Sequence, residues 1–324
     1  MKKYFKSIAL LLVAIMAIIL FSGCSSKVEE DHPIESGEKV KIGVACNNFN
    51  DLWMTYLIDA IKEQSELYPD YDFIYSDAKE DVATQISQVE DFINNGVSGI
   101  ILLAVNTDAC GPITTACNEA KIPIISVARL LANQEDATCY IGSESIEAGR
   151  MQGEAVLKDL MNGQGRVAIL MGPASNETSI MRTEGVKEVA KKYPGIEIVA
   201  VEIANWMRDE AITVTENWIQ SGLEFDAILS NNDEMAIGAV LALEAAGKKE
   251  GVLIAGIDAT PEALDFMKSG RIDITLLHDA ATQGKTAADS IVKAIQNTLE
   301  EDYIWIPFQL VTPDRADEFI DLQS

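Results

Sequence analysis

Residues Ile228–Leu264 read ILSNNDEMAIGAVLALEAAGKKEGVLIAGIDATPEAL, and this stretch decides the fold. It contains two short apolar runs, 227–230 and 252–257, that are typical of buried strands. Asn232 follows the first run and precedes a helix with an apolar face, and Asp258 follows the second run. In an open parallel sheet, ligands bind beyond the carboxyl ends of the strands. We therefore expect Asn232 and Asp258 to lie side by side at the edge of a cleft.

Strands alternate with amphipathic helices along the chain, which predicts an α/β fold built on parallel sheets. Gly163 and Gly165 interrupt the alternation and divide it into two doubly wound, Rossmann-like lobes. In the first lobe we expect strands at 40–45, 73–76, 99–103, 123–127 and 138–141, and helices at 52–67, 82–94, 112–120 and 146–161. In the second we expect strands at 166–171, 196–203, 227–230, 252–257 and 272–277, and helices at 179–192, 208–221, from 233 onward and 281–299. The segment IWIPFQLVT, 304–312, is split at Pro307 and reads as a final crossing between the lobes.

The first residues predict a secretory leader rather than a part of the fold. Three lysines precede an unbroken apolar run over 8–21, which is short for a membrane-spanning helix and typical of a signal peptide. Cys24 follows small residues and precedes a polar segment, so we expect a lipoprotein signal peptide over 1–23, acylation of Cys24 and a lipidated tether over 24–39. Phe21 departs from the leucine that is usual three positions before such a cysteine. The alternative is an ordinary membrane anchor with an incidental cysteine.

The charge of the chain excludes partners that carry many negative charges. The formal net charge is −26, and removal of the leader, with its three lysines and no acids, takes it to −29. Such a field repels nucleic acid and anionic lipid headgroups, so a nucleic-acid partner is disfavoured. No pairing follows from the spacing of the cysteines beyond Cys24, and we expect buried free thiols at Cys46, Cys110, Cys117 and Cys139.

The sequence lacks the residue patterns of the common active sites. Its histidines are His32, in the tether, and His278, so a histidine metal cluster is excluded and a Ser/His/Asp triad would need His278. No GxSxG elbow, GxxxxGKS/T phosphate loop or dinucleotide GxGxxG follows a strand. Carboxylates are numerous, so a pair of acids stays open. We predict a protein without catalytic activity, metal or cofactor.

The residues at the strand ends suit a small polyhydroxylated ring. An indole can cover the C–H face of a sugar, while carboxylate, amide and guanidinium groups hydrogen-bond its hydroxyls. The negative charges of Asp51 and Asp258 balance the positive charges of Arg129 and Arg182, which favours an uncharged ligand. The predicted ligand-binding residues are Asp51, Trp53, Arg129, Arg182, Trp206, Asn232, Asp258 and His278.

Each of these residues also has a structural alternative. The tryptophans can belong to the core, as we expect for Trp218 and Trp305 in periodic apolar segments, and the arginines can form surface ion pairs. Asn232 and Asp258 can simply cap the helices that follow them. His278 can be a structural histidine with its hydrogen bonds satisfied.

Four segments carry a resemblance to a known family: SNNDEMAIGA from residue 230, GIDATP from 256, RTEG from 182 and IPIISVAR from 122. From about Val40 to its end, the chain resembles the sugar-binding proteins of bacterial ABC importers, in the ribose and galactose branch of the periplasmic-binding-protein type I fold. The resemblance implies ligand contacts at the same eight positions. His278 stands where relatives carry Gln or Asn, and Ala128 where they carry Asp or Asn, so the identity of the sugar differs from theirs or stays open.

The resemblance also implies two lobes that close on the ligand about three chain crossings. The crossings fall near 141–143, 278–279 and 307–309, and they define an N-terminal lobe of 40–142 plus 279–307 and a C-terminal lobe of 143–278 plus 308–324. GIDATPEAL, HDAATQG and IWIPFQLVT are similar to segments of cyclitol-binding members, so myo-inositol joins ribose, galactose and glucose as a candidate ligand. The implied partner is a membrane ABC permease, and a monomer is expected.

Together these observations predict an extracytoplasmic, lipid-anchored substrate-binding protein of an ABC importer. It would capture a neutral ring sugar or cyclitol and deliver it unaltered to the permease. The alternative is an extracytoplasmic sugar sensor or a co-receptor for a signalling kinase, which the sequence does not distinguish. A sugar-dependent repressor would need a helix-turn-helix at the N-terminus, where this chain has a leader and a tether.

Overall fold

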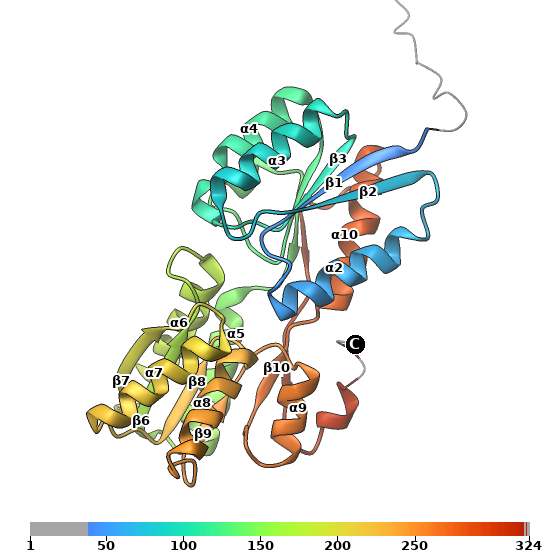
Figure 1. The fold of residues 1–324 in the computed structure, drawn as a ribbon. Coiled ribbons are helices and arrows are strands. Elements are labelled where there is room, and N and C mark those ends of the chain that lie inside the picture. Colours follow the sequence, from blue (N-terminus) through green and yellow to red (C-terminus); the bar gives the residue numbers. More distant parts are fainter. Residues whose placement is uncertain (1–37, 321, 323–324) are drawn as a thin grey trace, which may run out of the picture. The chain divides into compact units, whose positions relative to one another are not determined.

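The computed structural model describes residues 38–320 and 322, so the expected leader, the acylation site Cys24 and nearly all of the tether lie outside the described residues. Within them, strands and helices alternate in two parallel sheets (Figure 1). None of the helices in this part of the chain is long and apolar enough to cross a membrane.

The first sheet has the strand order β11-β5-β4-β3-β1-β2, and all neighbouring strands are parallel. Helices cover both of its faces. The strands are β1 (Val40–Cys46), β2 (Tyr71–Asp77), β3 (Gly99–Leu102), β4 (Ile124–Val127), β5 (Cys139–Gly142) and β11 (Tyr303–Trp305), and the helices are α2 (Leu52–Ser65), α3 (Val82–Asn94), α4 (Gly111–Ala120) and α10 (Ala280–Ile295).

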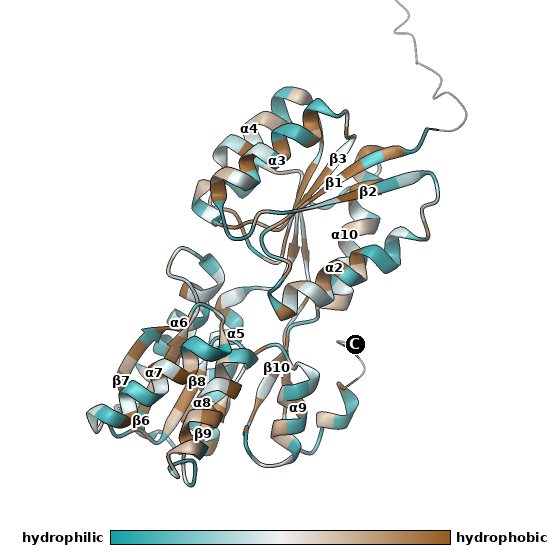
Figure 2. Ribbon diagram, in the orientation of Figure 1, coloured by the Kyte–Doolittle hydropathy of each residue, from teal (hydrophilic) through white to brown (hydrophobic). Residues whose placement is uncertain are grey.

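Successive side chains along the central strands point to opposite faces, which explains why helices cover both faces of this sheet. Ile100 and Leu102 pack with α3 and α4 on one face, whereas Ile101 and Leu103 pack with α2 and α10 on the other. Figure 2 shows apolar residues concentrated in the strands and on the helix faces turned towards them. A strand buried on both faces needs an unbroken apolar run, which is what the sequence of β3 has.

The second sheet repeats the arrangement with the strand order β7-β6-β8-β9, again all parallel. One face packs against α6, and the other against α7, α8 and α9. The strands are β6 (Gln164–Met171), β7 (Gly195–Ile203), β8 (Ala227–Ser230) and β9 (Leu253–Ala255), and the helices are α5 (Ser145–Gly153), α6 (Glu177–Ala190), α7 (Arg208–Ser221), α8 (Asp233–Ala245) and α9 (Pro261–Lys268). The predicted α/β class with two doubly wound parallel sheets is therefore confirmed.

A short antiparallel pair, β10 (Thr275–Leu277) with β12 (Gln309–Val311), stands beside the second sheet. Isolated parallel bridges join it to the β9 segment at Ala255–Ile274 and Asp258–Leu277. The chain thus leaves the first sheet at Trp305, passes Pro307 and runs back along β10. The antiparallel direction differs from the all-parallel expectation, because a strand that arrives from the first sheet enters from the opposite end.

Several helices begin at a polar residue whose side chain accepts a hydrogen bond from the first turn. The backbone N–H groups of the first turn have no partner inside the helix, so such a cap stabilises the start by about 1 kcal/mol. The capping side chains are Asp51 for α2, Asp81 for α3, Asn176 for α6, Asn232 for α8, Thr260 for α9 and Asp279 for α10. Helix starts therefore follow from local chemistry.

Several further expectations about the elements were wrong. The helix expected over 281–299 in the second lobe is α10, which packs against the first sheet. Trp305 is 48% exposed on the edge strand β11, where it stacks with Tyr303, whereas Trp218 does lie in the core. The helix expected over 146–161 becomes π-helical from Glu154 to Leu160. The helix expected to reach 299 ends at Ile295, because Asn297 takes a left-handed conformation with φ 57°. Short 3-10 turns occupy Thr107–Ala109, Gln134–Asp136 and Ala316–Glu318.

Helices α5 and α6 approach so closely that two glycines are required at their contact. A Cβ on Gly149 would lie 2.0 Å from the carbonyl oxygen of Arg182, and one on Gly185 would lie 2.4 Å from that of Ile146. Both obstacles are backbone atoms, which cannot move aside as a flexible side chain can. The short distance between α5 and α6 therefore depends on these two glycines.

Substitution of Gly185 by Ala should lower the free energy of unfolding by about 1 to 3 kcal/mol, because the added methyl group forces α5 and α6 apart. Urea denaturation measures the change. Gly111→Ala is the matched control, since a Cβ at Gly111 in the first turn of α4 meets no atom within 4 Å. Equal stability of the two variants would contradict the close contact.

Candidate functional site

All eight predicted site residues line one pocket, at the carboxyl ends of strands from both sheets. They are Asp51, Trp53, Arg129, Arg182, Trp206, Asn232, Asp258 and His278, joined by Met54, Ala128 and Thr178. This inner pocket has a volume of about 40 Å³. Five of the eight also line an adjoining outer cavity of about 640 Å³. The fold thus brings together residues that lie more than 200 positions apart in the sequence, such as Asp51 and Asp258.

Trp53 is held by His278. The indole Nε1 donates to the carbonyl oxygen of His278 at 2.8 Å, and the two rings stack with centroids 3.9 Å apart at 5°. The imidazole in turn stacks on Phe308 at 4.9 Å. One face of Trp53 is therefore covered by His278, and the side chain as a whole is only 6% exposed and belongs to the core of the first lobe as well as lining the pocket.

Arg182 lies on α6 and is only 2% exposed, so the surface ion-pair alternative is wrong for it. Its Nη1 donates to the carbonyl oxygen of Asn231 at 2.6 Å and lies 3.8 Å from Asp258 Oδ1. Its Nη2 lies 3.2 Å from Nδ1 of His278. Because a guanidinium only donates, this imidazole nitrogen accepts and the ring proton lies on Nε2. Burial, with the Arg182 charge, holds the pKa of His278 well below its ordinary value, so the ring is neutral.

Asp258 occupies a strained turn between β9 and α9. Its φ is 129°, and Ala259 follows with φ 55°, conformations that residues with a side chain rarely adopt. Thr260, rather than Asp258, caps α9, so the capping alternative for Asp258 is wrong. Burial raises the pKa of Asp258 well above its ordinary value, and the Arg182 charge opposes that shift.

Asp233 supports this turn, and sequence reasoning treated it only as the start of a helix. The residue is fully buried, and its carboxylate accepts from Thr260 N at 2.8 Å, from Thr260 Oγ1 at 3.3 Å and from Thr275 Oγ1 at 2.7 Å. Burial raises the pKa of Asp233 to about 6, while these hydrogen bonds act in the opposite direction. The carboxylate of Asp233 therefore holds the turn that carries Asp258.

Asn232 combines the two roles that the sequence left open. Its Oδ1 caps α8 by accepting from Met235 N at 3.0 Å, and its Nδ2 donates to the carbonyl oxygen of Trp206 at 3.2 Å. Trp206 has a left-handed backbone with φ 68°, and its ring packs so tightly that a Cβ on Gly172 would lie 2.4 Å from it. The indole is thereby fixed at the pocket wall, with the guanidinium of Arg182 5.8 Å from its centre.

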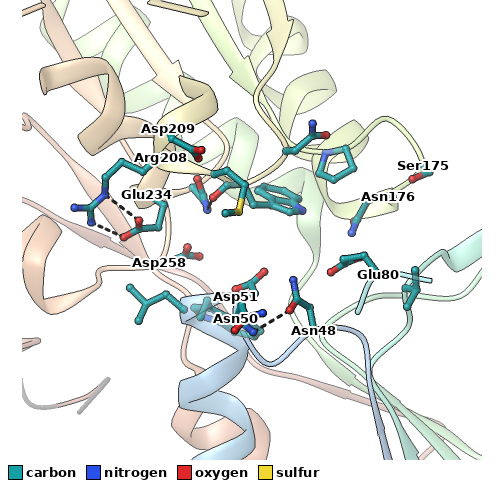
Figure 3. A pocket seen from close by; sticks show the side chains of 18 of the residues that line it. Asn48, Asn50, Asp51, Glu80, Ser175, Asn176, Arg208, Asp209, Glu234 and Asp258 are labelled. Atoms are coloured by element: carbon teal, nitrogen blue, oxygen red, sulfur yellow. Dashed lines mark hydrogen bonds and ion pairs between the residues drawn. The ribbon is translucent and has the colours of Figure 1, made fainter. Parts of the chain in front are cut away.

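The remaining predicted residues, Arg129 and Asp51, are also held by backbone contacts. Arg129 is 4% exposed, and its Nη1 donates to the carbonyl oxygen of Ala104 at 2.6 Å, so it is not a surface ion-pair partner. Asp51 is half-buried and caps α2 through Met54 N at 3.1 Å. One oxygen of Asp51 is engaged in this cap, and Figure 3 shows the side chain beside the outer cavity.

Two kinds of donor in the pocket lack a partner. Nε of Arg182 and Nε1 of Trp206 are buried and have no hydrogen-bond partner among the described residues. Buried polar groups in native proteins are rarely left unpaired, and each one costs about 1 to 3 kcal/mol.

The outer cavity adds polar residues that the sequence reasoning missed. Arg208 is committed to two carboxylates, donating to Glu234 at 2.8 Å and to Glu262 at 2.6 Å, so it offers little charge to a ligand (Figure 3). The other missed polar residues of the lining include Asn48, Glu80, Asn106, Ser175, Asn176, Asp209 and Glu234. Several of them directly follow β1, β2, β3 or β6, so applying the strand-end rule to every strand would have found them.

The raised pKa of Asp233 generates a prediction about stability and pH. The folded chain binds this proton more tightly than the unfolded chain, because the pKa is about 6 against an ordinary 3.8. Relative to Asp233→Asn, the wild-type free energy of unfolding should fall by up to about 3 kcal/mol as the pH rises from about 4 through about 6, and stay level above that.

Urea denaturation across this pH range measures the difference, with Asp265→Asn at an exposed position of α9 as the control. A wild-type advantage that is constant, or that grows with pH, would show that Asp233 does not titrate in this way.

Comparison with known proteins places this site in a family. Residues 42–299 match the family described as "Periplasmic binding protein domain". A putative rhizopine-binding protein of Rhizobium meliloti is 37% identical over 284 residues, which cover 86% of this chain and 92% of the relative. A xylitol-binding protein of Mycolicibacterium smegmatis is 33% identical, over 83% of this chain and 77% of the relative.

Among solved structures, an ABC transporter solute-binding protein from Bacillus halodurans with bound myo-inositol is 43% identical and superimposes with a TM-score of 0.85. The match covers 88% of this chain and 99% of that protein. With a match over most of the chain and a pocket between two parallel-sheet lobes, this protein belongs to the periplasmic binding protein domain family.

Proposed function

We propose that this chain is the substrate-binding protein of an ABC importer and that it captures a neutral ring sugar or cyclitol. The observation that carries the proposal is the inner pocket, where indole, guanidinium, carboxylate, amide and imidazole groups converge. A pyranose or cyclitol ring has a C–H face and a rim of hydroxyls that need such partners. The myo-inositol bound to the Bacillus halodurans protein supports a ligand of that type ahead of ribose, galactose or glucose.

Each pocket residue has a role in this proposal. Trp53 and Trp206 line the pocket and cover the ligand, and Arg182 and Asp258 take neighbouring hydroxyls. The other predicted contacts are Asp51, Arg129, Asn232 and His278, which line the same pocket.

Binding would be accompanied by closure of two lobes, 40–142 plus 279–307 and 143–278 plus 308–324. The hydroxyl of Ser143 supports a hinge at the three crossings near 141–143, 278–279 and 307–309. It donates to the carbonyl oxygen of Ile306 at 2.6 Å and accepts from Nε2 of Gln283 at 3.3 Å. This side chain thus joins the first crossing to Ile306 and Gln283, which lie beside the other two.

The proposal includes no chemical change to the ligand and no cofactor. No group of three or more His, Cys, Asp or Glu side chains within residues 38–320 could hold a metal ion. Burial raises the pKa of Cys46, Cys110, Cys117 and Cys139 to about 12, so these free thiols stay protonated and weakly nucleophilic.

The sensor or kinase co-receptor that the sequence left open uses the same binding step. The Bacillus halodurans relative is a solute-binding protein of an ABC transporter, which favours import over sensing. We further propose an extracytoplasmic monomer whose partner is the membrane permease. Acylated Cys24, exposed by cleavage of a signal peptide over 1–23, would hold it at the membrane through the tether 24–39.

Titration calorimetry should detect binding of at least one member of a panel of myo-inositol, ribose, galactose and glucose. Trp206→Ala should weaken that binding at least tenfold, because the lost apolar contact is worth roughly 2 kcal/mol. Trp305→Ala is the matched control, since this tryptophan is exposed on β11 and lines neither cavity.

Silent titrations with the whole panel would count decisively against the function. Unchanged affinity in Trp206→Ala would remove that residue from the site and leave the function standing.

The lipid anchor has its own test in cells that express the full chain. The wild type should incorporate radiolabelled palmitate and Cys24→Ser should not, because its hydroxyl replaces the thiol that is acylated. Ser25→Ala, which leaves the thiol in place, should behave as the wild type. Lipid labelling that persists in Cys24→Ser would disprove acylation at this position.

A further inference from the structure

Glu80 is held in place at the wall of the outer cavity by a strained loop between β2 and α3. Lys79 and Glu80 both have left-handed backbones, with φ 52° and 61°. Such strain persists only where the surroundings impose it. Here Lys79 N donates to Asp77 Oδ1 and Glu80 N donates to the carbonyl oxygen of Asn47, each at 2.9 Å.

The carboxylate of Glu80 is fixed by the same neighbour. Asn47 is fully buried, and its Nδ2 donates to Oε1 of Glu80 at 2.8 Å. The paired contacts of Asn47 with the backbone and the side chain of Glu80 hold one carboxylate oxygen on the protein. The other oxygen remains as an acceptor for groups in the cavity.

Asn176, from the second lobe, lines the same cavity as Glu80. It is 2% exposed, and its Oδ1 accepts from Thr178 N at 2.9 Å as the cap of α6. The cap fixes the amide so that the nitrogen end is turned into the cavity, across from Glu80 (Figure 3). A charged acceptor and an amide donor thus face one another from two lobes.

We propose that Glu80 and Asn176 form an outer subsite that binds a polyhydroxylated substituent on the ring held in the inner pocket. This inference rests on the proposed function and narrows its ligand to a conjugate such as a glycosylated cyclitol. A hydroxyl can donate to Glu80 and accept from Asn176, which uses both groups. An anion would be repelled by Glu80, and an ammonium could not accept from Asn176.

The size of the outer cavity agrees with a ligand larger than one ring. At about 640 Å³, it falls within the roughly 300 to 1,000 Å³ of pockets that hold drug-sized molecules. Trp53, Trp206 and Asp258 are among the residues that line both spaces. A ring that contacts them could therefore extend a substituent into the outer cavity, towards Glu80.

Calorimetry with myo-inositol and with a monogalactoside of myo-inositol tests the subsite. We expect the wild type to bind the galactoside at least about tenfold more tightly. Glu80→Gln and Asn176→Ser should each remove most of that gain and leave the affinity for myo-inositol within about twofold. Serine keeps the cap of α6 while it removes the amide donor, and glutamine keeps an acceptor for Asn47. Glu90→Gln, which makes the same charge change at an exposed position of α3, should have no effect.

A galactoside that binds no more tightly than myo-inositol would overturn the subsite, as would variants that weaken both ligands by the same factor. Binding of myo-inositol would still stand in either case, so the proposed function would survive. Failure of both ligands to bind would also overturn the subsite, and the proposed function would then depend on the titrations with ribose, galactose and glucose. Thermal melting of each variant confirms that the change lies in the site rather than in the fold.

Discussion

The guanidinium of Arg182 is almost fully buried, so its partners must lie inside the protein. The arrangement of the site follows from the positions of these partners. The carbonyl oxygen of Asn231, the imidazole of His278 and the carboxylate of Asp258 surround the guanidinium. These partners come from the ends of β8, β9 and β10, so one buried charge joins the ends of three strands. Removal of the Asp258 carboxylate would leave the buried charge without its nearest counter-charge.

The packing behind this cluster of Arg182 and its partners is equally exacting. Gly149 allows the backbone of Arg182 to come within contact of α5, and Gly172 allows the ring of Trp206 to lie flat against β6 and its following loop. Asp233 adds hydrogen bonds that hold the turn of Asp258 in a conformation it would otherwise avoid. The strained backbone and the close contacts lower the stability of the fold, but they hold a few side chains in place, as expected of a pre-organised binding site.

The aromatic stack of Trp53, His278 and Phe308 connects this cluster to the first lobe. Trp53 lies on α2, whereas His278 and Phe308 lie in the segments that pass between the sheets. In the proposed closure, a ligand that contacts Trp53 would act directly on His278 and Phe308, which lie at two of the proposed crossings. Binding would thereby be linked to domain movement without a longer pathway through the core.

The sequence by itself determined the alternation of strands and helices and the site residues at the strand ends, because the period of the apolar residues, the helix caps and the strand ends are local features. Arg182 lies inside α6, and the resemblance to the family pointed to it. Sequence reasoning left out Asp233, Glu80 and Asn176, and it placed Trp305 in the core. Whether a polar group at a helix start is buried, and whether an apolar strand lies at an edge, depends on what packs against it from elsewhere in the chain. The pairing of charges, the antiparallel β12 and the depth of Arg182 were decided only by tertiary structure, since each depends on contacts between segments far apart in sequence.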